Sequence, residues 1–154
     1  MHTFDGRRDD LPAPENFDGI IITGSDHSVY ERLPWMLHLE GYLRTAIIDE
    51  CHVLGLCFGH QLLASAFGGL VARNPRGRET GRVLATPVAK DEALGFPSEP
   101  FPVLMVHQDT VQQPPLGSVV LAHTERDAHA AIRFGARCWG VQFHPEFSAE
   151  VLRV

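Results

Sequence analysis

A single cysteine, Cys57, lies between Gly55 and Gly59 in the stretch GLCFGHQ. The apolar run before it is typical of a buried strand, and the pattern after it is typical of a helix. Two glycines let the backbone turn sharply there and present the intervening side chain at the carboxyl edge of a sheet. The N–H groups that open the helix favour a thiolate and lower the thiol pKa by roughly one unit or more. Cys57 is therefore a candidate nucleophile.

A nucleophilic cysteine needs a base, and the base needs a residue that orients it. The stretch WGVQFHPEF supplies His144 at the end of a predicted strand and Glu146 two residues later. Pro145 holds His144 in an extended conformation, so that Glu146 can turn back and accept a hydrogen bond from the imidazole. We expect a catalytic triad of Cys57, His144 and Glu146, and the backbone N–H of Phe58 is positioned to stabilise an oxyanion.

The composition suits one globular domain over residues 1–154. A net charge of −6 argues against a nucleic-acid partner bound through a basic surface. No run of roughly 18 apolar residues predicts a membrane span, and the first residues lack the apolar core of a signal peptide. The three cysteines form no close pair and the histidines no ligand motif, so we expect a cytoplasmic protein without a metal or cofactor.

The first half of the chain alternates strand and helix patterns. FDGIIITGS and HVLGLC are typical of buried strands, and amphipathic patterns follow each of them. This order predicts an α/β fold whose central sheet is mostly parallel and carries helices on both faces. Short strands separated by Pro and Gly turns fill the second half and predict added antiparallel strands.

Both ends of the chain depart from this pattern. Nothing before Phe17 reads as the opening strand and helix of an α/β domain. A last helix, with Ser148 as its N-cap, has barely begun when the sequence stops. We therefore expect a domain that lacks its first strand and is shortened at both ends, with self-association into a homo-oligomer as one way to compensate.

These motifs resemble those of the class I glutamine amidotransferase domain, and of its GMP synthase-like members most closely. GLCFGHQ matches the nucleophile motif G-x-C-x-G-x-Q, and HPE matches the motif of the base and its orienting glutamate. The resemblance assigns these roles to Cys57, His144 and Glu146. It also places Gly24, in IITGS, in the oxyanion loop, and Gln61 in the wall of the substrate pocket. The implied architecture is the flavodoxin-like fold of that family.

The resemblance implies hydrolysis of the side-chain amide of L-glutamine through a thioester on Cys57. Glutamate and ammonia are the products, and a synthase or another ammonia-acceptor protein is the implied partner. No cofactor, nucleic acid or membrane takes part. Two alternatives stay open: a γ-glutamyl hydrolase on the same scaffold, and a non-catalytic regulatory homologue.

Two further stretches have counterparts in the family. VHQDTV contains His107 and Asp109, and RETG spans residues 78–81. We interpret both as structural or partner-facing, and the simplest alternative is a pair of solvated polar loops.

Overall fold

The structure is a computed structural model that describes residues 1–8 and 10–147. The helix predicted to begin at Ser148 lies outside the described residues. In chain order the elements are η1 (Pro14–Asn16), β1 (Gly19–Ile22), η2 (Val29–Glu31), α1 (Pro34–Ile48), β2 (His52–Leu56), α2 (Phe58–Ala66), β3 (Leu70–Arg73), β4 (Glu79–Pro87), β5 (Phe101–His107), β6 (Asp109–Gln113), β7 (Val119–His123), β8 (Ala131–Gly135) and β9 (Cys138–Val141).

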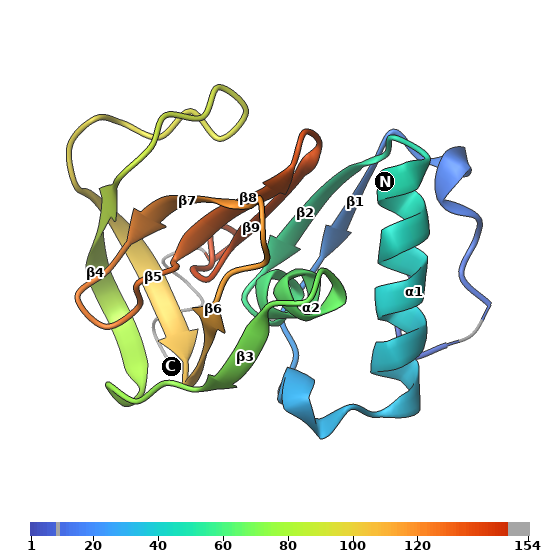
Figure 1. Cartoon of the computed structure of the whole chain (residues 1–154), viewed down its shortest axis with the longest axis horizontal. Helices are drawn as coiled ribbons and strands as arrows, with labels where there is room; N and C mark the ends of the chain where they lie inside the picture. The colour runs from blue at the N-terminus through green and yellow to red at the C-terminus, as the bar shows by residue number, and fades with distance from the viewer. Residues whose placement is uncertain (9, 148–154) are drawn as a thin grey trace.

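Seven strands form one mixed sheet in the order β1-β2-β9-β8-β7-β4-β5 (Figure 1). The strands β1, β2 and β9 are parallel. The pairs β9–β8, β8–β7, β7–β4 and β4–β5 are antiparallel. The α/β class is confirmed, but the parallel part of the sheet is limited to three strands. The last strand, β9, inserts between β2 and β8, which brings the predicted base next to the predicted nucleophile.

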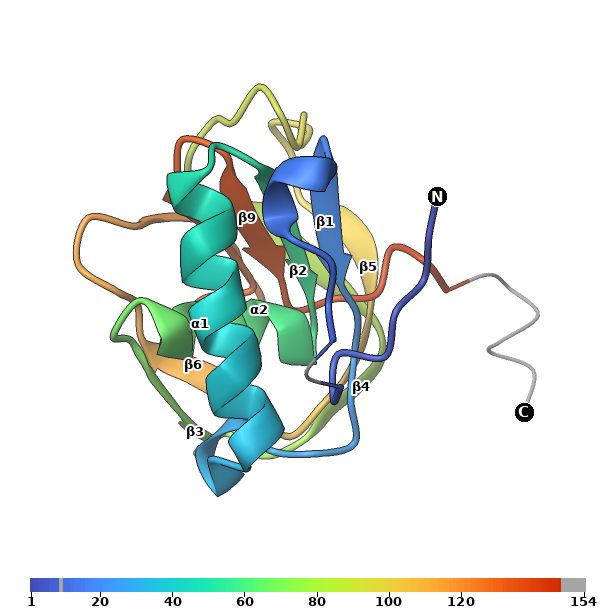
Figure 2. The same ribbon diagram turned by 90° about the vertical axis from the view of Figure 1, so that its right-hand side faces the viewer.

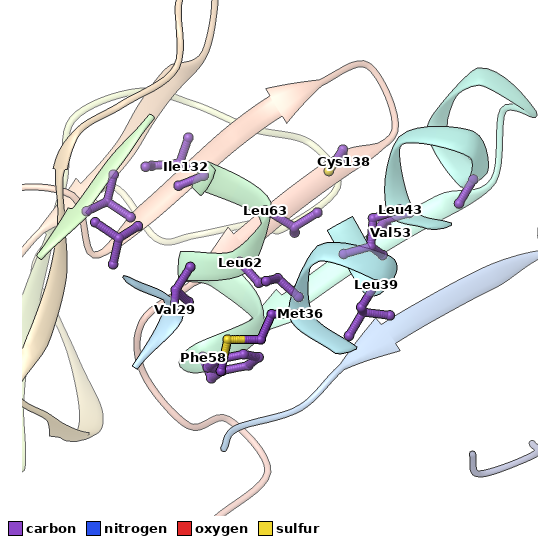
Figure 3. Packing of buried hydrophobic residues seen from close by; sticks show 14 of the residues in the cluster. Val29, Met36, Leu39, Leu43, Val53, Phe58, Leu62, Leu63, Ile132 and Cys138 are labelled. Carbon is purple, nitrogen blue, oxygen red and sulfur yellow. The ribbon is translucent and has the colours of Figure 1, made fainter. Parts of the chain in front are cut away.

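Both α helices cover the same face of the sheet, which differs from the expected arrangement of helices on both faces. Figure 2 shows α1 and α2 side by side in front of β1, β2 and β9. Their apolar side chains form one core with that face of the sheet (Figure 3). Ten of its members are Val29, Met36, Leu39, Leu43, Val53, Phe58, Leu62, Leu63, Ile132 and Cys138.

The face of the sheet opposite the helices packs against the sheet's own antiparallel strands. Alternate residues of β2 and β9 point to opposite sides: Val53 and Cys138 join the helical core, whereas Leu54 and Trp139 pack with the second cluster. That second cluster is made by the antiparallel strands and by residues 89–96. Because β4 pairs with β7 at one end and with β5 along most of its length, these strands bury apolar surface that a second layer of helices would otherwise cover.

The longer helix, α1, follows the predicted pattern. Pro34 is its first residue, where the missing N–H costs nothing. Met36, Leu39 and Leu43 are buried at helical spacing. Glu40 on the same helix is also buried, and its carboxylate accepts a hydrogen bond from Arg32 at 2.8 Å. None of the described helices is long and apolar enough to cross a membrane.

A second, two-stranded sheet of β3 and β6 was absent from the sequence-based prediction. These strands are antiparallel, with Ala72 opposite Thr110. The strand β6 begins at Asp109, directly after β5 ends at His107. The second sheet therefore carries the VHQDTV stretch to the mouth of the candidate site.

Candidate active site

The nucleophile turn has the geometry expected from its two glycines. Cys57 is the N-cap of α2 and has φ 52° and ψ −105°, a conformation that costs a non-glycine residue energy. A Cβ on Gly55 would lie 2.5 Å from the carbonyl of Gly59, and a Cβ on Gly59 would overlap the carbonyl of Ile22. Only glycine at both positions lets α2 pack this closely on β1 and β2 while Cys57 caps the helix.

The Cys57 thiol is more deeply buried than predicted. Its residue is 9% exposed, and Sγ donates a weak hydrogen bond to the Val106 carbonyl at 3.8 Å. Burial raises the pKa of Cys57 to about 11, although hydrogen bonding to the Phe58 N–H acts in the opposite direction. The expected resting thiolate is therefore wrong, because loss of water outweighs the helix N-terminus. In the free protein the thiol keeps its proton.

The predicted base and its orienting residue are in contact. His144 follows β9, is 8% exposed, and its Nδ1 lies 2.7 Å from Oε1 of Glu146. The backbone N–H of His144 donates to the Leu104 carbonyl at 2.9 Å. Phe147 stacks on the imidazole with ring centroids 4.1 Å apart. Glu146 thus holds Nδ1 of the ring and Phe147 covers one of its faces. Nε2 is left for proton transfer.

Gly24 lies close to both Cys57 and His144, the predicted nucleophile and base. It follows β1 in the loop after the carboxyl end of that parallel strand. A Cβ built on Gly24 would contact Cε1 of His144 at 3.5 Å and Cβ of Cys57 at 3.9 Å. The structure therefore brings together three predicted site residues from three separate parts of the chain.

A pocket of about 250 Å³ opens beside the thiol. Side chains of both charge signs line it: Asp26 and Asp109 are acidic, and Arg78 is basic. Such a lining suits a ligand that carries an ammonium and a carboxylate group. The full lining is Ser25, Asp26, His27, Ser28, Cys57, Phe58, Gln61, Arg78, Val106, His107, Gln108 and Asp109.

The VHQDTV and RETG stretches are not solvated loops, because their central residues are buried. His107 is 6% and Glu79 5% exposed, and their side chains are 3.1 Å apart. The other ring nitrogen of His107 lies 2.9 Å from the Asp109 carbonyl. Both of these partners are acceptors, so both nitrogens must carry a proton and His107 is an imidazolium. The carboxylate of Glu79 also accepts from the Thr124 hydroxyl.

The pKa directions agree with this charged pair. Burial alone lowers the pKa of His107, but hydrogen bonds to Glu79 and Asp109 outweigh it and raise the pKa above the ordinary value. Burial raises the pKa of Glu79, but hydrogen bonds from His107 and Thr124 outweigh it and lower that pKa. The pair therefore fixes the backbone at the start of β6.

Gln61 lies one helical turn after the nucleophile and is 4% exposed. Its Nε2 donates to the Asp109 carbonyl at 3.0 Å and to Oε1 of Gln142 at 2.9 Å. Both amide hydrogens are therefore used within the protein. Gln61 is part of the pocket lining, and only its oxygen is left for a ligand. Its role in substrate binding stays a prediction.

Sequence reasoning singled out Asp109, Arg78 and Glu79 without placing them at the pocket, and it missed Gln142. Asp109 and Arg78 line the pocket, whereas Glu79 and Gln142 are buried and do not line it. One signal was available for Gln142: it stands two residues before His144 at the end of a predicted strand, so its side chain shares a face with that histidine. The position of the other three at or behind the pocket depends on a strand pairing that local patterns do not reveal.

The remaining cysteines have no place in the site. Cys51 and Cys138 are unpaired and buried, and burial raises the pKa of Cys138 to about 12. Across residues 1–8 and 10–147 no three His, Cys, Asp or Glu side chains gather in a way that could hold a metal ion.

The family model of glutamine amidotransferase class-I matches residues 3–153. Among solved structures, a glutamine amido transferase from Methylobacillus flagellatus superimposes with a TM-score of 0.85 at 32% identity. That alignment covers 93% of this chain and 58% of the other. The same fold is thus found within a longer chain.

The curated relatives of this chain carry several different names. A putative glutamine amidotransferase-like protein of Schizosaccharomyces pombe is 34% identical over 93% of this chain, and gamma-glutamyl peptidase 5 of Arabidopsis thaliana is 30% identical over 99%. The chain spans 59% and 62% of their lengths. The GMP synthase of Thermosipho africanus is 38% identical over 82% of this chain, which spans 24% of that protein.

Proposed function

This chain belongs to the class I glutamine amidotransferase family, and from that premise we propose that it hydrolyses the side-chain amide of L-glutamine to glutamate and ammonia. One observation carries the proposal. A Cβ on Gly24 would touch both the imidazole of His144 and the side chain of Cys57, so nucleophile, base and oxyanion loop surround one point. The charged groups of the adjacent pocket support an amino acid as the ligand.

The first half of the reaction forms a thioester. The Cys57 thiol gives its proton to Nε2 of His144 as Sγ attacks the γ-carbonyl carbon of glutamine. The N–H groups of Gly24 and Phe58 stabilise the resulting oxyanion. His144 then gives the proton to the departing ammonia. Because burial raises the pKa of the Cys57 thiol, the attack on glutamine requires His144 to take the proton from Sγ.

The second half releases glutamate. His144 takes a proton from water, and the hydroxide attacks the thioester carbonyl. The carbon–sulfur bond breaks and Cys57 regains its proton from His144. Glu146 accepts a hydrogen bond from Nδ1 throughout, which fixes the tautomer and stabilises the imidazolium. The ammonia passes to an acceptor on a partner protein, and the chain works without a metal or cofactor in the cytoplasm.

Glutamate release from L-glutamine by this chain tests the proposal. We expect Cys57→Ala to abolish release, because no other thiol lines the pocket. The matched control is Cys51→Ala, which removes a buried thiol outside the pocket. This variant should release glutamate at the wild-type rate. Glu146→Gln should stay folded and turn over more slowly. Equal rates in wild type and Cys57→Ala would refute the assignment.

A γ-glutamyl peptidase activity is the second candidate. The Arabidopsis thaliana proteins of that name align over 99% of this chain, whereas the Thermosipho africanus GMP synthase aligns over 82%. The acyl half of both reactions is the same, and only the leaving group differs. A comparison of kcat/KM for L-glutamine and for γ-glutamyl dipeptides decides between them, and faster release from the dipeptides would favour the peptidase.

A non-catalytic homologue is excluded by one further measurement. Iodoacetamide labels accessible thiols according to their thiolate fraction. In a working site we expect L-glutamine to protect Cys57 from labelling and to leave Cys51 unaffected. A chain that neither releases glutamate nor shows this protection would be a regulatory homologue rather than an enzyme.

A further inference from the structure

The nucleophile has a buried amide beside it to which the mechanism above assigns no role. Gln142 is 0% exposed, and it follows Val141, whose carbonyl accepts the backbone N–H of Cys57 at 2.9 Å. Among the described residues, Nε2 of Gln142 is a buried donor without a hydrogen-bond partner. A buried amide donor without a partner is unfavourable, because it has lost its hydrogen bonds to water. Such a group calls for an explanation.

The orientation of this amide follows from one unambiguous acceptor. The Asp109 carbonyl can only accept, so the amide nitrogen of Gln61 must face it. The second hydrogen of that nitrogen then points to Gln142, whose oxygen must face it in turn. The nitrogen of Gln142 is therefore directed away from Gln61, and the Gln142 side chain is near enough to Cys57 to lower the pKa of its thiol. Exchanging oxygen and nitrogen in either side chain would set two like groups against each other.

We propose that Gln142 donates a hydrogen bond from Nε2 to the sulfur of Cys57, and that Gln61 is the positioning residue that holds it in this orientation. The donor stabilises negative charge on sulfur as the proton leaves for His144. Gln142 stays neutral and takes no proton itself. In the resting state the thiol hydrogen faces the Val106 carbonyl, so a sulfur lone pair is left to accept the amide N–H.

The electrostatics of the site make this donor useful. Burial raises the pKa of Cys57, and the charges of Glu146 and Asp109 raise it further. Hydrogen bonds from the Phe58 N–H and the Gln142 side chain are the contributions that lower it. A sulfur with 9% of its residue exposed has little water to replace them. Loss of either donor therefore makes the thiolate scarcer.

The hydrogen bonds extend beyond the two glutamines. The carbonyl of Asp109 accepts from Gln61 and also from His107, which pairs with Glu79. A buried chain of hydrogen bonds thus runs from a carboxylate on β4 to the nucleophile on β2–α2. Its middle member, Gln61, makes no direct contact with sulfur in this arrangement. Gln61 acts through Gln142, and this gives the proposal a quantitative test.

The test measures the rate at which iodoacetamide alkylates Cys57 between pH 7 and pH 10, with mass spectrometry separating Cys57 from Cys51 and Cys138. We expect Gln142→Leu to slow alkylation of Cys57 about tenfold at each pH, as a one-unit rise in its pKa requires. Glutaminase kcat/KM should fall by a similar factor. The control, Gln112→Leu, changes an exposed glutamine of β6 and should match wild type.

A double-mutant cycle isolates the role of Gln61. We expect Gln61→Leu to slow alkylation less than Gln142→Leu does, because a freed amide still samples the bonded orientation. The double variant should equal Gln142→Leu, since Gln61 acts only through Gln142. Gln142→Met repeats the measurement with an unbranched side chain in case leucine prevents folding.

Three outcomes would overturn the proposal. These are unchanged alkylation in both Gln142 variants, additive effects in the cycle, and lower turnover with an unchanged thiol pKa. The proposal rests on the assigned role of Cys57 as nucleophile, but alkylation needs no turnover. A wild-type chain that releases no glutamate would therefore contradict the proposed function while the alkylation series still decides the role of Gln142.

Discussion

The apolar core beneath the helices and the polar chain behind the pocket are both buried, but they are held together differently. In the core, Leu43 and its neighbours contact many side chains through forces that have little direction. In the polar chain, Glu79, His107 and Gln61 each have a few partners at defined positions. A lost methyl group in the core leaves a cavity, whereas one lost acceptor in the chain leaves buried charges and donors unpaired.

The difference teaches where stability and activity are coupled. Neither α1 nor its core residues line the pocket, so a change there should cost stability without altering the chemistry of folded molecules. The polar chain includes Asp109 in the pocket wall and reaches Gln142, which accepts a hydrogen bond from Gln61. A change there should alter both. The predictions below test this contrast, with the largest expected effect first.

Glu79→Gln should have the largest effect. It removes the negative partner of a buried imidazolium, and breaking such a pair costs about 3–5 kcal/mol of unfolding free energy. Urea denaturation measures this loss, and glutamine turnover per folded molecule should fall as well. Glu125→Gln is the control, because this carboxylate is exposed in a neighbouring loop. If Glu79→Gln were less stable but fully active, the polar chain would not be coupled to the chemistry of the site.

The loss in Glu79→Gln should also depend on pH. The pKa of His107 is raised, so its contribution is fully present below 6.5 and is lost as pH rises through the folded-state pKa. The pKa of Glu79 is lowered, so its contribution is present above 4.5 and is lost as pH falls. The difference in unfolding free energy between wild type and variant should therefore be largest between pH 4.5 and pH 6.5. A gap that does not change with pH would contradict the charged pair.

Leu43→Ala should have the second largest effect. The side chain is fully buried in the helical core, and truncation of a buried leucine costs about 3 kcal/mol. Turnover per folded molecule should stay at the wild-type value, because this residue lies outside the pocket lining. Leu37→Ala on the same helix is the control, since Leu37 is 42% exposed. Urea denaturation and glutaminase assays on the same samples give both quantities.

His60→Met should have the smallest effect, and only in acid. His60 is a polar residue enclosed by the core, and burial lowers its pKa to about 3. The unfolded chain binds a proton below pH 6.5 while the folded chain does not, so stability falls on acidification by up to ~1.4 kcal/mol per pH unit. The variant should lose less stability between pH 6.5 and pH 4.5 than wild type does. His38→Met changes an exposed histidine and should follow wild type.

Local patterns were sufficient for the parts of the site that lie close together in sequence. Gly55, Cys57 and Gly59 predicted the sharp turn, because two absent side chains at that spacing serve close packing. The contact between His144 and Glu146 followed from the proline between them. The α/β class and the strand at β1 were predicted for the same reason, since their patterns repeat within a few residues.

Long-range register limited the rest of the prediction. Glu79 reaches His107 only because β4 pairs antiparallel with β5. The burial of Cys57 depends on strands far along the chain, so the helix N-terminus alone gave the wrong direction for its pKa. The strand Leu70–Arg73 has only one buried residue, and its partner β6 opens with a charged residue, so neither shows a strand pattern. The side-by-side placement of α1 and α2 likewise depends on how the sheet curls.

The position of β9 has a consequence for chain synthesis. It is the last described strand in the sequence, yet it lies inside the sheet between β2 and β8. A growing chain therefore exposes the Cys57 turn long before the strand that leads to His144 has been made. Pairing β2 with β9 closes a long loop, which is a slow step in folding. Cys57 and His144, the proposed nucleophile and base, therefore come together only after β9 has been synthesised and has paired with β2.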